Sequence, residues 1–287
     1  MALLLQQILN GIMLGSVYSL VALGLTLIYG ILHIPNFAHG HKYMLAAFTS
    51  FFLVTNFHTN YWVALVIAMG VLGLVGMGVE RWVYRPLRNV PHINSFIAAI
   101  GLLLMIESFA LILFGADFRR FPPLYDQPIH IFGVGITLQR LLVILAAALL
   151  ILLLQLFLKR TWLGATIEAV AQSPEGAQLV GISIDRVSSL TFGLGTALAA
   201  AAATLITPIF LVYPTMGSVP NLRAFVVIII GGMGSIPGAV IGGLMLGLIE
   251  SLGGGFISTD YKDIFAFGAL VTFLTFRPMG LFGKGGR

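Results

Sequence analysis

Long uninterrupted runs of apolar residues constrain this chain more than any other feature. Residues 9–31 include no charged side chain, and residues 95–114 include only Glu107. A helix needs about 20 apolar residues to cross the roughly 30 Å hydrocarbon core of a bilayer. Backbone groups in lipid must also satisfy one another, which helices do within a single segment. The sequence therefore predicts an all-α, polytopic membrane helical bundle.

Composition agrees, because 59% of the residues are hydrophobic, 9% are charged and the mean hydropathy is +1.03. The runs are continuously apolar and do not alternate, which disfavours a β-barrel. The polar loops are short, so we expect residues 1–287 to form a single transmembrane domain. About eight to nine spans are expected, near residues 9–31, 42–57, 62–83, 95–114, 138–158, 188–212, 225–233, 238–252 and 264–276.

Two of these segments, 42–57 and 225–233, are too short to cross a bilayer unaided. Each follows a Pro-Asn pair that would break a helix, at Pro35-Asn36 and at Pro220-Asn221. Both are interpreted as interrupted or re-entrant segments. Basic residues cluster in loops expected to be cytoplasmic: Arg81, Arg85, Arg88, Lys159, Arg160 and Arg186. This orientation places the two breaks on opposite sides of the membrane and suggests an inverted repeat, which in transporters often brackets the substrate path.

The loop at about residues 159–187 is polar but has the signals of a short helix. Ser173 suits the N-cap and Pro174 the first helical position, Glu175 favours the positive end of the dipole, and Gly181 can close the far end. We expect a helix of about two turns here. It is either a docking element or an ordinary capped helix within a loop.

Polar side chains near the breaks are candidates for a translocation path. Asn36, His39 and Asn221 could line an aqueous path or cap freed backbone groups. Glu107 lies near the middle of a span, where an ionised carboxylate costs a few kcal/mol or more. Its role is either functional or an interhelical hydrogen bond. No carboxylate near His39 and His41 completes a metal site, so none is expected.

Four glycines at helical spacing allow close approach of helices in lipid, either within one bundle or at a subunit interface: Gly238, Gly242, Gly243 and Gly247. The sequence contains no Gly-x-x-x-x-Gly-Lys-Ser/Thr loop, nucleophile elbow or His-Glu-x-x-His pair. It also contains no cysteine, which excludes thiolate metal sites. We expect neither an ATPase site nor a catalytic site in this chain.

Four strings together resemble the permeases of branched-chain amino acid ABC transporters. The first runs from Gly24 to Gly30 and continues as Asn36-Phe37-Ala38-His39-Gly40. The others are 168–187, Gly231-Gly232-Met233-Gly234-Ser235-Ile236-Pro237-Gly238, and Arg277-Pro278-Met279-Gly280-Leu281-Phe282-Gly283. They follow in order over nearly the whole chain. Val170 departs from the general importer pattern, which has an alanine there, and weakens the transfer of single residues.

The resemblance implies a multi-pass permease subunit of an ABC importer in the bacterial inner membrane, more closely the first of two homologous permeases in a heterodimer. It implies two cytoplasmic ATPase subunits that hold ATP and Mg²⁺, and a periplasmic solute-binding protein. This chain would bind no cofactor and no nucleic acid. Branched-chain or other hydrophobic amino acids, or related small solutes, would be the substrates. The ATPase-coupling residues would be Glu168, Ser173, Pro174, Glu175, Gln178 and Gly181.

The alternative is an ion-coupled secondary transporter or channel for a small solute. Such a protein would need no motor and no docking helix. A membrane enzyme would need a nucleophile and a base at one interface, and the sequence offers no such set.

Overall fold

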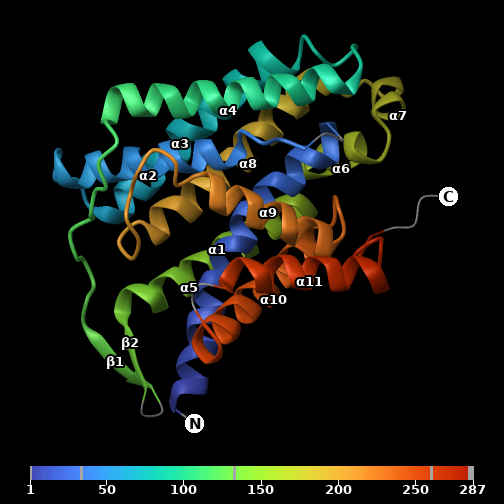
Figure 1. The fold of residues 1–287 in the computed structure, drawn as a ribbon. Coiled ribbons are helices and arrows are strands. Elements are labelled where there is room, and N and C mark those ends of the chain that lie inside the picture. The colour runs from blue at the N-terminus through green and yellow to red at the C-terminus, as the bar shows by residue number, and fades with distance from the viewer. Residues whose placement is uncertain (1, 33–34, 132–133, 259–260, 284–287) are drawn as a thin grey trace.

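The structure is a computed structural model and describes residues 2–32, 35–131, 134–258 and 261–283. Its helices and strands follow in the order α1 (Ala2–Leu32), α2 (His39–Thr55), α3 (Tyr61–Val79), the π-helical turn η1 (Glu80–Tyr84), α4 (His92–Phe114), β1 (Pro128–Ile131), β2 (Val134–Thr137), α5 (Leu138–Arg160), α6 (Trp162–Gln172), α7 (Pro174–Leu179), α8 (Ile184–Ile206), α9 (Ser218–Gly231), α10 (Ile236–Phe256) and α11 (Lys262–Phe276). Figure 1 shows the arrangement.

Within the described residues, six helical segments are long and apolar enough to cross a membrane: α1, α3 with η1, α4, α5, α8 and α10. This supports a multi-pass helical membrane protein. The helices α2, α9 and α11 have 17, 14 and 15 residues and are shorter than a full span. The two interrupted segments expected from the sequence correspond to α2 and α9.

The start of α9 differs from the prediction. We expected the helix to begin after Pro220-Asn221, but it begins at Ser218 and includes both residues in its first turn. A proline is tolerated there because the first N–H groups of a helix have no intrahelical acceptor.

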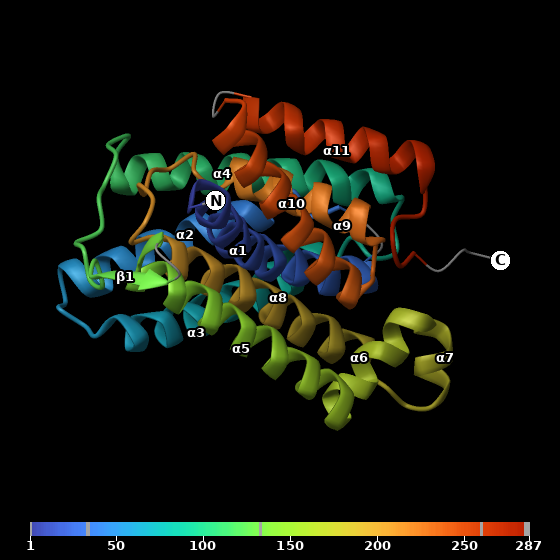
Figure 2. The ribbon, with the colours of Figure 1, turned by 90° about the horizontal axis from the view of Figure 1, so that it is seen from below.

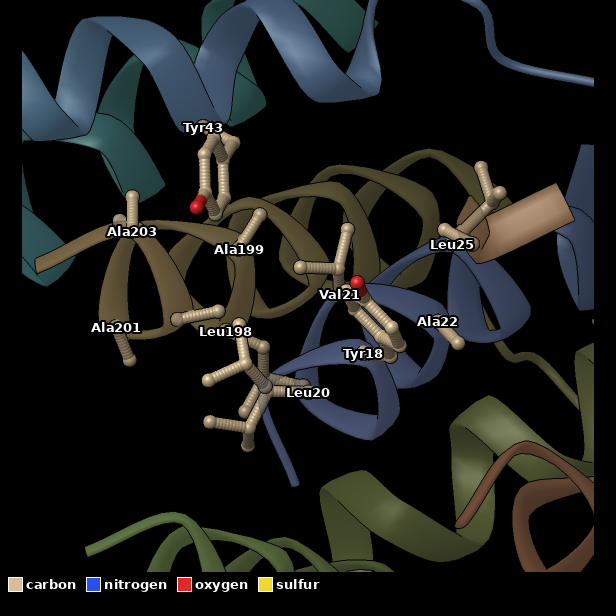
Figure 3. Packing of buried hydrophobic residues seen from close by; sticks show 14 of the residues in the cluster. Tyr18, Leu20, Val21, Ala22, Leu25, Tyr43, Leu198, Ala199, Ala201 and Ala203 are labelled. Carbon is tan, nitrogen blue, oxygen red and sulfur yellow. The ribbon is translucent and has the colours of Figure 1, made fainter. Parts of the chain in front are cut away.

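Helix α1 forms the centre of the bundle. In α1, 89% of the most apolar stretch is buried inside the protein, whereas in α5 the share is 17%. Figure 3 shows Leu20 and Val21 of α1 facing the alanine-rich α8, with Tyr43 of α2 against the same helix. The small side chains of α8, such as Ala199, let these helices approach closely. The outer helices α4 and α5 have only 22% and 17% of their most apolar stretches buried inside the protein, as expected for a lipid-facing surface.

The two ends of the molecule carry different structures. The helices α6 and α7 lie at one end, and the antiparallel β1–β2 hairpin lies at the other (Figures 1 and 2). Neither α6 nor the hairpin was expected from the sequence. The hairpin is a small departure from an all-helical fold, and it precedes α5 in a loop outside the spanning segments.

Candidate functional site

The short helix that the sequence predicts near Ser173 is α7. The Ser173 Oγ accepts a 3.1 Å hydrogen bond from the backbone N–H of Gly176, and Pro174 occupies the first turn. At the other end Gly181 has a φ of +82°, and the N–H of Ile182 bonds to the carbonyl of Ala177 at 3.0 Å. Both ends of this six-residue helix are therefore closed by local hydrogen bonds.

Most of the residues proposed for ATPase coupling point to solvent. Pro174 is half-buried, and the others are exposed: Glu168, Ser173, Glu175, Gln178 and Gly181. Sequence reasoning missed Leu179 and Val180, whose side chains are 89% and 76% exposed. Two adjacent apolar residues in an otherwise polar, solvent-facing loop are a signal that could have found them.

A small apolar cluster attaches α7 to the bundle. Ala177 of α7 is buried with Ile31 of α1, Val187 of α8, and Ile167 and Val170 of α6. Helix α7 is therefore packed directly against the end of α1 and the start of α8.

Beside this cluster, ionic contacts join the end of α3 to the start of α8. The buried Glu80 carboxylate accepts from Arg85 Nη2 at 2.9 Å and from Arg88 Nη2 at 3.0 Å. Arg88 Nη1 also pairs with Asp185 Oδ1 at 2.6 Å. Ser189 of α8 donates to Glu80 and accepts from Arg85. The hydrogen bond with Glu80 raises the pKa of Arg85, so this guanidinium stays charged.

A hydrogen bond at the other end of η1 reaches the bundle interior. The buried Tyr84 hydroxyl donates to Asn36 Oδ1 at 3.0 Å. The π-helical turn therefore connects the ionic contacts of Glu80, at its first residue, to the segment between α1 and α2. Turns of this type recur at functional sites.

The two predicted breaks meet each other. Asn221 Nδ2 donates to the carbonyl of Phe37 at 2.8 Å, and Asn221 Oδ1 accepts from the N–H of Gly40 at 3.0 Å. A Cβ atom at Gly40 would collide with the carbonyl of Gly217, so the N-terminal ends of α2 and α9 lie in contact. Helix α2 then leads toward the hairpin end of the molecule and α9 toward the other end (Figure 1).

This contact corrects the prediction that the breaks lie on opposite sides of the membrane. Each short helix begins inside the bundle, where their N-termini meet. The charges of the loops predict on which side of the membrane each loop lies. They do not predict how deep in the membrane a helix begins when it starts in the interior of the bundle. Paired half-helices that run in opposite directions are typical of transporters built from inverted repeats.

The remaining path candidates lie on or against α2. Glu107 Oε2 of α4 is 2.9 Å from His41 Nε2, and this pair links α4 to α2. His39 Nε2 lies 3.2 Å from the carbonyl of Val21 in α1, and its ring is fully buried. Three of the candidates therefore lie around the start of α2: Asn36, His39 and Asn221. The fourth, Glu107, contacts α2 through His41.

Three charged side chains inside the helices were not singled out from the sequence. Arg223 of α9 pairs with the buried Glu250 of α10 at 2.6 Å, and Tyr18 donates to the same carboxylate at 2.7 Å. Lys42 of α2 is fully buried. A charged residue within an apolar run is the signal that could have identified all three.

The four candidate packing glycines contact helices of this same chain. A Cβ at Gly243 would meet Ser19, and one at Gly247 would meet the backbone of Gly15. Gly238 and Gly242 lie in the same way against α9. These glycines therefore pack α10 against α1 and α9 within the bundle.

The chain is similar to known transport proteins over nearly its full length. Residues 7–274 match the family model described as the permease component of the branched-chain amino acid transport system. LivH of Salmonella typhimurium, a high-affinity branched-chain amino acid transport system permease protein, is 34% identical over 98% of this chain and 96% of its own. The corresponding protein BraD of Pseudomonas aeruginosa is 34% identical over the same shares.

More distant similarity extends to other proteins. The fructose import permease protein FrcC of Rhizobium meliloti is 35% identical over 41% of this chain and 34% of its own. The solved structure of PsaBC from Streptococcus pneumoniae in complex with Fab has a TM-score of 0.52 at 10% identity and covers 92% of this chain and 90% of that chain, which shows a shared fold. With the family model and the curated relatives spanning nearly all of its length, the chain belongs to the family of permease components of the branched-chain amino acid transport system.

Proposed function

We propose that this chain is a permease subunit of an ATP-driven ABC importer in the bacterial inner membrane. Its substrates are branched-chain or other hydrophobic amino acids, or related small solutes. The names of LivH and BraD support branched-chain amino acids as the substrates. The partial similarity to the fructose permease FrcC is the reason for including other small solutes.

The proposed assembly contains a second, homologous permease in a heterodimer, two cytoplasmic ATPase subunits and a periplasmic solute-binding protein. ATP and Mg²⁺ bind to the ATPase subunits, and this chain is not an enzyme and needs no cofactor of its own. The observation that carries the proposal is α7, a capped helix that exposes Leu179 and Val180 at the end of the molecule bearing the basic loops.

In this mechanism α7 lies in a groove of an ATPase subunit. That subunit is contacted by the exposed Leu179 and Val180 and by four of the residues expected from the sequence: Glu168, Glu175, Gln178 and Gly181. Ser173 and Pro174 hold the helix in shape. When the ATPase subunits close on ATP, α7 moves and carries the ends of α1 and α8 with it through the cluster around Ala177.

We further propose that the translocation path passes the contact between α2 and α9. Asn36, His39 and Asn221 surround this contact, and Glu107 approaches it through His41. The ionic contacts of Glu80 and the Tyr84–Asn36 hydrogen bond connect it to the α7 end. Motion of the ATPase subunits would thereby open the path alternately to the two sides.

The docking role is tested by copurification in mild detergent. A Glu175→Lys, Gln178→Lys double variant should retain the second permease and lose most of the ATPase subunits, because two lysines replace side chains on the contact surface. The matched control is Asp126→Lys with Gln127→Lys, since these residues are exposed near the hairpin end and carry the same side-chain types. ATPase subunits retained by the α7 variant at the control level would refute docking through this helix.

The alternative is an ion-coupled secondary transporter. The Glu107–His41 pair could carry a proton between helices, which is the observation in its favour. Such a protein would move solute without ATPase subunits and would tolerate the α7 variant.

A further inference from the structure

Lys42 lies in an environment that leaves its charge uncompensated. Its side chain is fully buried, and among the described residues its Nζ has no hydrogen-bond partner. The ammonium lies over the ring of Phe192, whose centroid is 5.6 Å away. An ammonium inside a membrane protein costs several kcal/mol when nothing pairs with it.

The position of Lys42 within α2 adds to this cost. It is the fourth residue of a 17-residue helix, and helical side chains lean toward the N-terminus. The N-terminal end of a helix carries partial positive charge, which favours anions and opposes cations. The N-terminus of α9 also reaches this place, because Asn221 bonds to Gly40. The N-terminal ends of α2 and α9 therefore meet two residues before Lys42.

A second unpartnered donor is linked to Lys42 through two aromatic rings. Asn36 is 1% exposed, and its Nδ2 has no partner among the described residues, while its Oδ1 accepts from Tyr84. The ring of Tyr84 packs on Phe192 at 5.2 Å between centroids, and Phe192 is also the ring beneath Lys42. The amide of Asn36 and the ammonium of Lys42 thus border one aromatic pair.

We propose that Lys42 Nζ and Asn36 Nδ2 form a carboxylate-binding site on the translocation path, which holds the carboxylate of the transported amino acid. A carboxylate offers two acceptor oxygens, one for each unpartnered donor, and its negative charge matches the helix ends. Phe192 and Tyr84 supply apolar surface for the rest of the solute. The assignment rests on the proposed import of amino acids.

The first experiment measures leucine uptake into proteoliposomes that contain the complete importer with its binding protein. Lys42→Met keeps the length and apolar character of the side chain without its charge. Uptake should fall about tenfold or more, the effect expected for losing one charge-assisted hydrogen bond, while ATP hydrolysis stimulated by the binding protein persists. Lys262→Met is the matched control, since Lys262 starts α11 and lies outside this site.

The second experiment places a fixed carboxylate in the site. Asn36→Asp preserves side-chain size and the acceptor for Tyr84, and its second oxygen replaces the unpartnered Nδ2. The proposal predicts that the variant raises the Tm of the detergent-solubilised complex, because Lys42 gains a partner, and that it blocks leucine uptake. A Tm that is unchanged or lower, or a failure to assemble, overturns the carboxylate site.

The outcomes separate this site from the proposed function. If the wild-type complex imports no amino acid with ATP, the proposed function fails. If the wild type imports leucine and a folded Lys42→Met or Asn36→Asp variant does so at the same rate, only the carboxylate site is refuted. Should Lys42→Met fail to assemble, the Tm and uptake of Asn36→Asp decide.

Discussion

The Tyr84 hydroxyl donates a 3.0 Å hydrogen bond to Asn36 Oδ1 in the interior of the bundle. Tyr84 is the last residue of η1, and the first residue, Glu80, is held by Arg85 and Arg88. Arg88 in turn pairs with Asp185 at the start of α8. These contacts therefore join the start of α8 to Asn36, which lies just before the start of α2.

Removal of the Tyr84 hydroxyl should weaken this connection without unfolding the protein. Tyr84→Phe keeps the ring contact with Phe192 but removes the donor that the described residues give to Asn36 Oδ1, which costs about 1–3 kcal/mol for a buried acceptor. We expect uptake to fall severalfold while the ATPase subunits remain bound, as measured by proteoliposome uptake and copurification. Tyr125→Phe removes a hydroxyl from the loop before β1 and should have little effect. Equal uptake by the two variants would rule out a role for the Tyr84 bond.

Neutralising Glu80 should separate ATP hydrolysis from transport. Glu80→Gln removes the negative charge that pairs with Arg85 and Arg88. Hydrogen bonds to charged groups contribute about 1.5–3 kcal/mol each. The contribution is smaller here because both guanidinium groups are partly exposed to solvent. The variant should hydrolyse ATP but import solute roughly tenfold more slowly, since about 1.4 kcal/mol corresponds to a factor of ten. Asp117→Asn, an exposed acid near the other end, is the control. Import and hydrolysis falling in proportion would argue against a coupling role.

Alanine at Asn221 should damage transport more than assembly. The change removes both hydrogen bonds to the segment that starts α2: the one that Asn221 donates to the carbonyl of Phe37 and the one that it accepts from the N–H of Gly40. The two helix ends would no longer be fixed to each other, so we expect a severalfold loss of uptake with near-normal yield of the complex. Asn94→Ala on the exposed first turn of α4 is the control. Wild-type uptake by Asn221→Ala would remove this residue from the path.

Crowding the contact between α1 and α10 should lower stability. The Cβ of Gly247→Ala would meet the backbone of Gly15, which cannot rotate away as a side chain can. Such overpacking costs about 1–3 kcal/mol, and a lower Tm in detergent should report it. The Cβ of Gly101→Ala on α4 meets no atom of the described residues within 4 Å. This variant should keep or raise the Tm, because alanine favours helix. A Tm for Gly247→Ala that matches this control would contradict close packing at Gly247.

The sequence predicted the features that depend on local pattern. Apolar runs located the long helices, and the Ser173, Pro174 and Gly181 signals located α7, because caps act within a few residues. The charge pattern also agrees with the structure at one point. Arg88, which follows η1, pairs with Asp185 in the first turn of α8, so these two basic stretches lie at the same end of the molecule.

Features that depend on contacts between distant segments were not predicted. Asn221 bonds to Phe37 and Gly40 at the start of α2. To predict this contact one must know how deep in the bundle each short helix begins, and hydropathy does not give that depth. Lys42 lies at the start of an apolar run, where it could equally reach a polar surface or the interior. The packing of α8 against α2 in the structure is what shows that Lys42 Nζ is enclosed beside Phe192.

The most direct test of the central claim is leucine uptake by proteoliposomes that contain the complete importer, with ATP supplied to the ATPase subunits and no ion gradient. We expect uptake that requires ATP and the binding protein and that is lost in the Glu175→Lys, Gln178→Lys variant. Uptake that continues without ATP, follows an imposed proton or sodium gradient and is unaffected by the variant would contradict it.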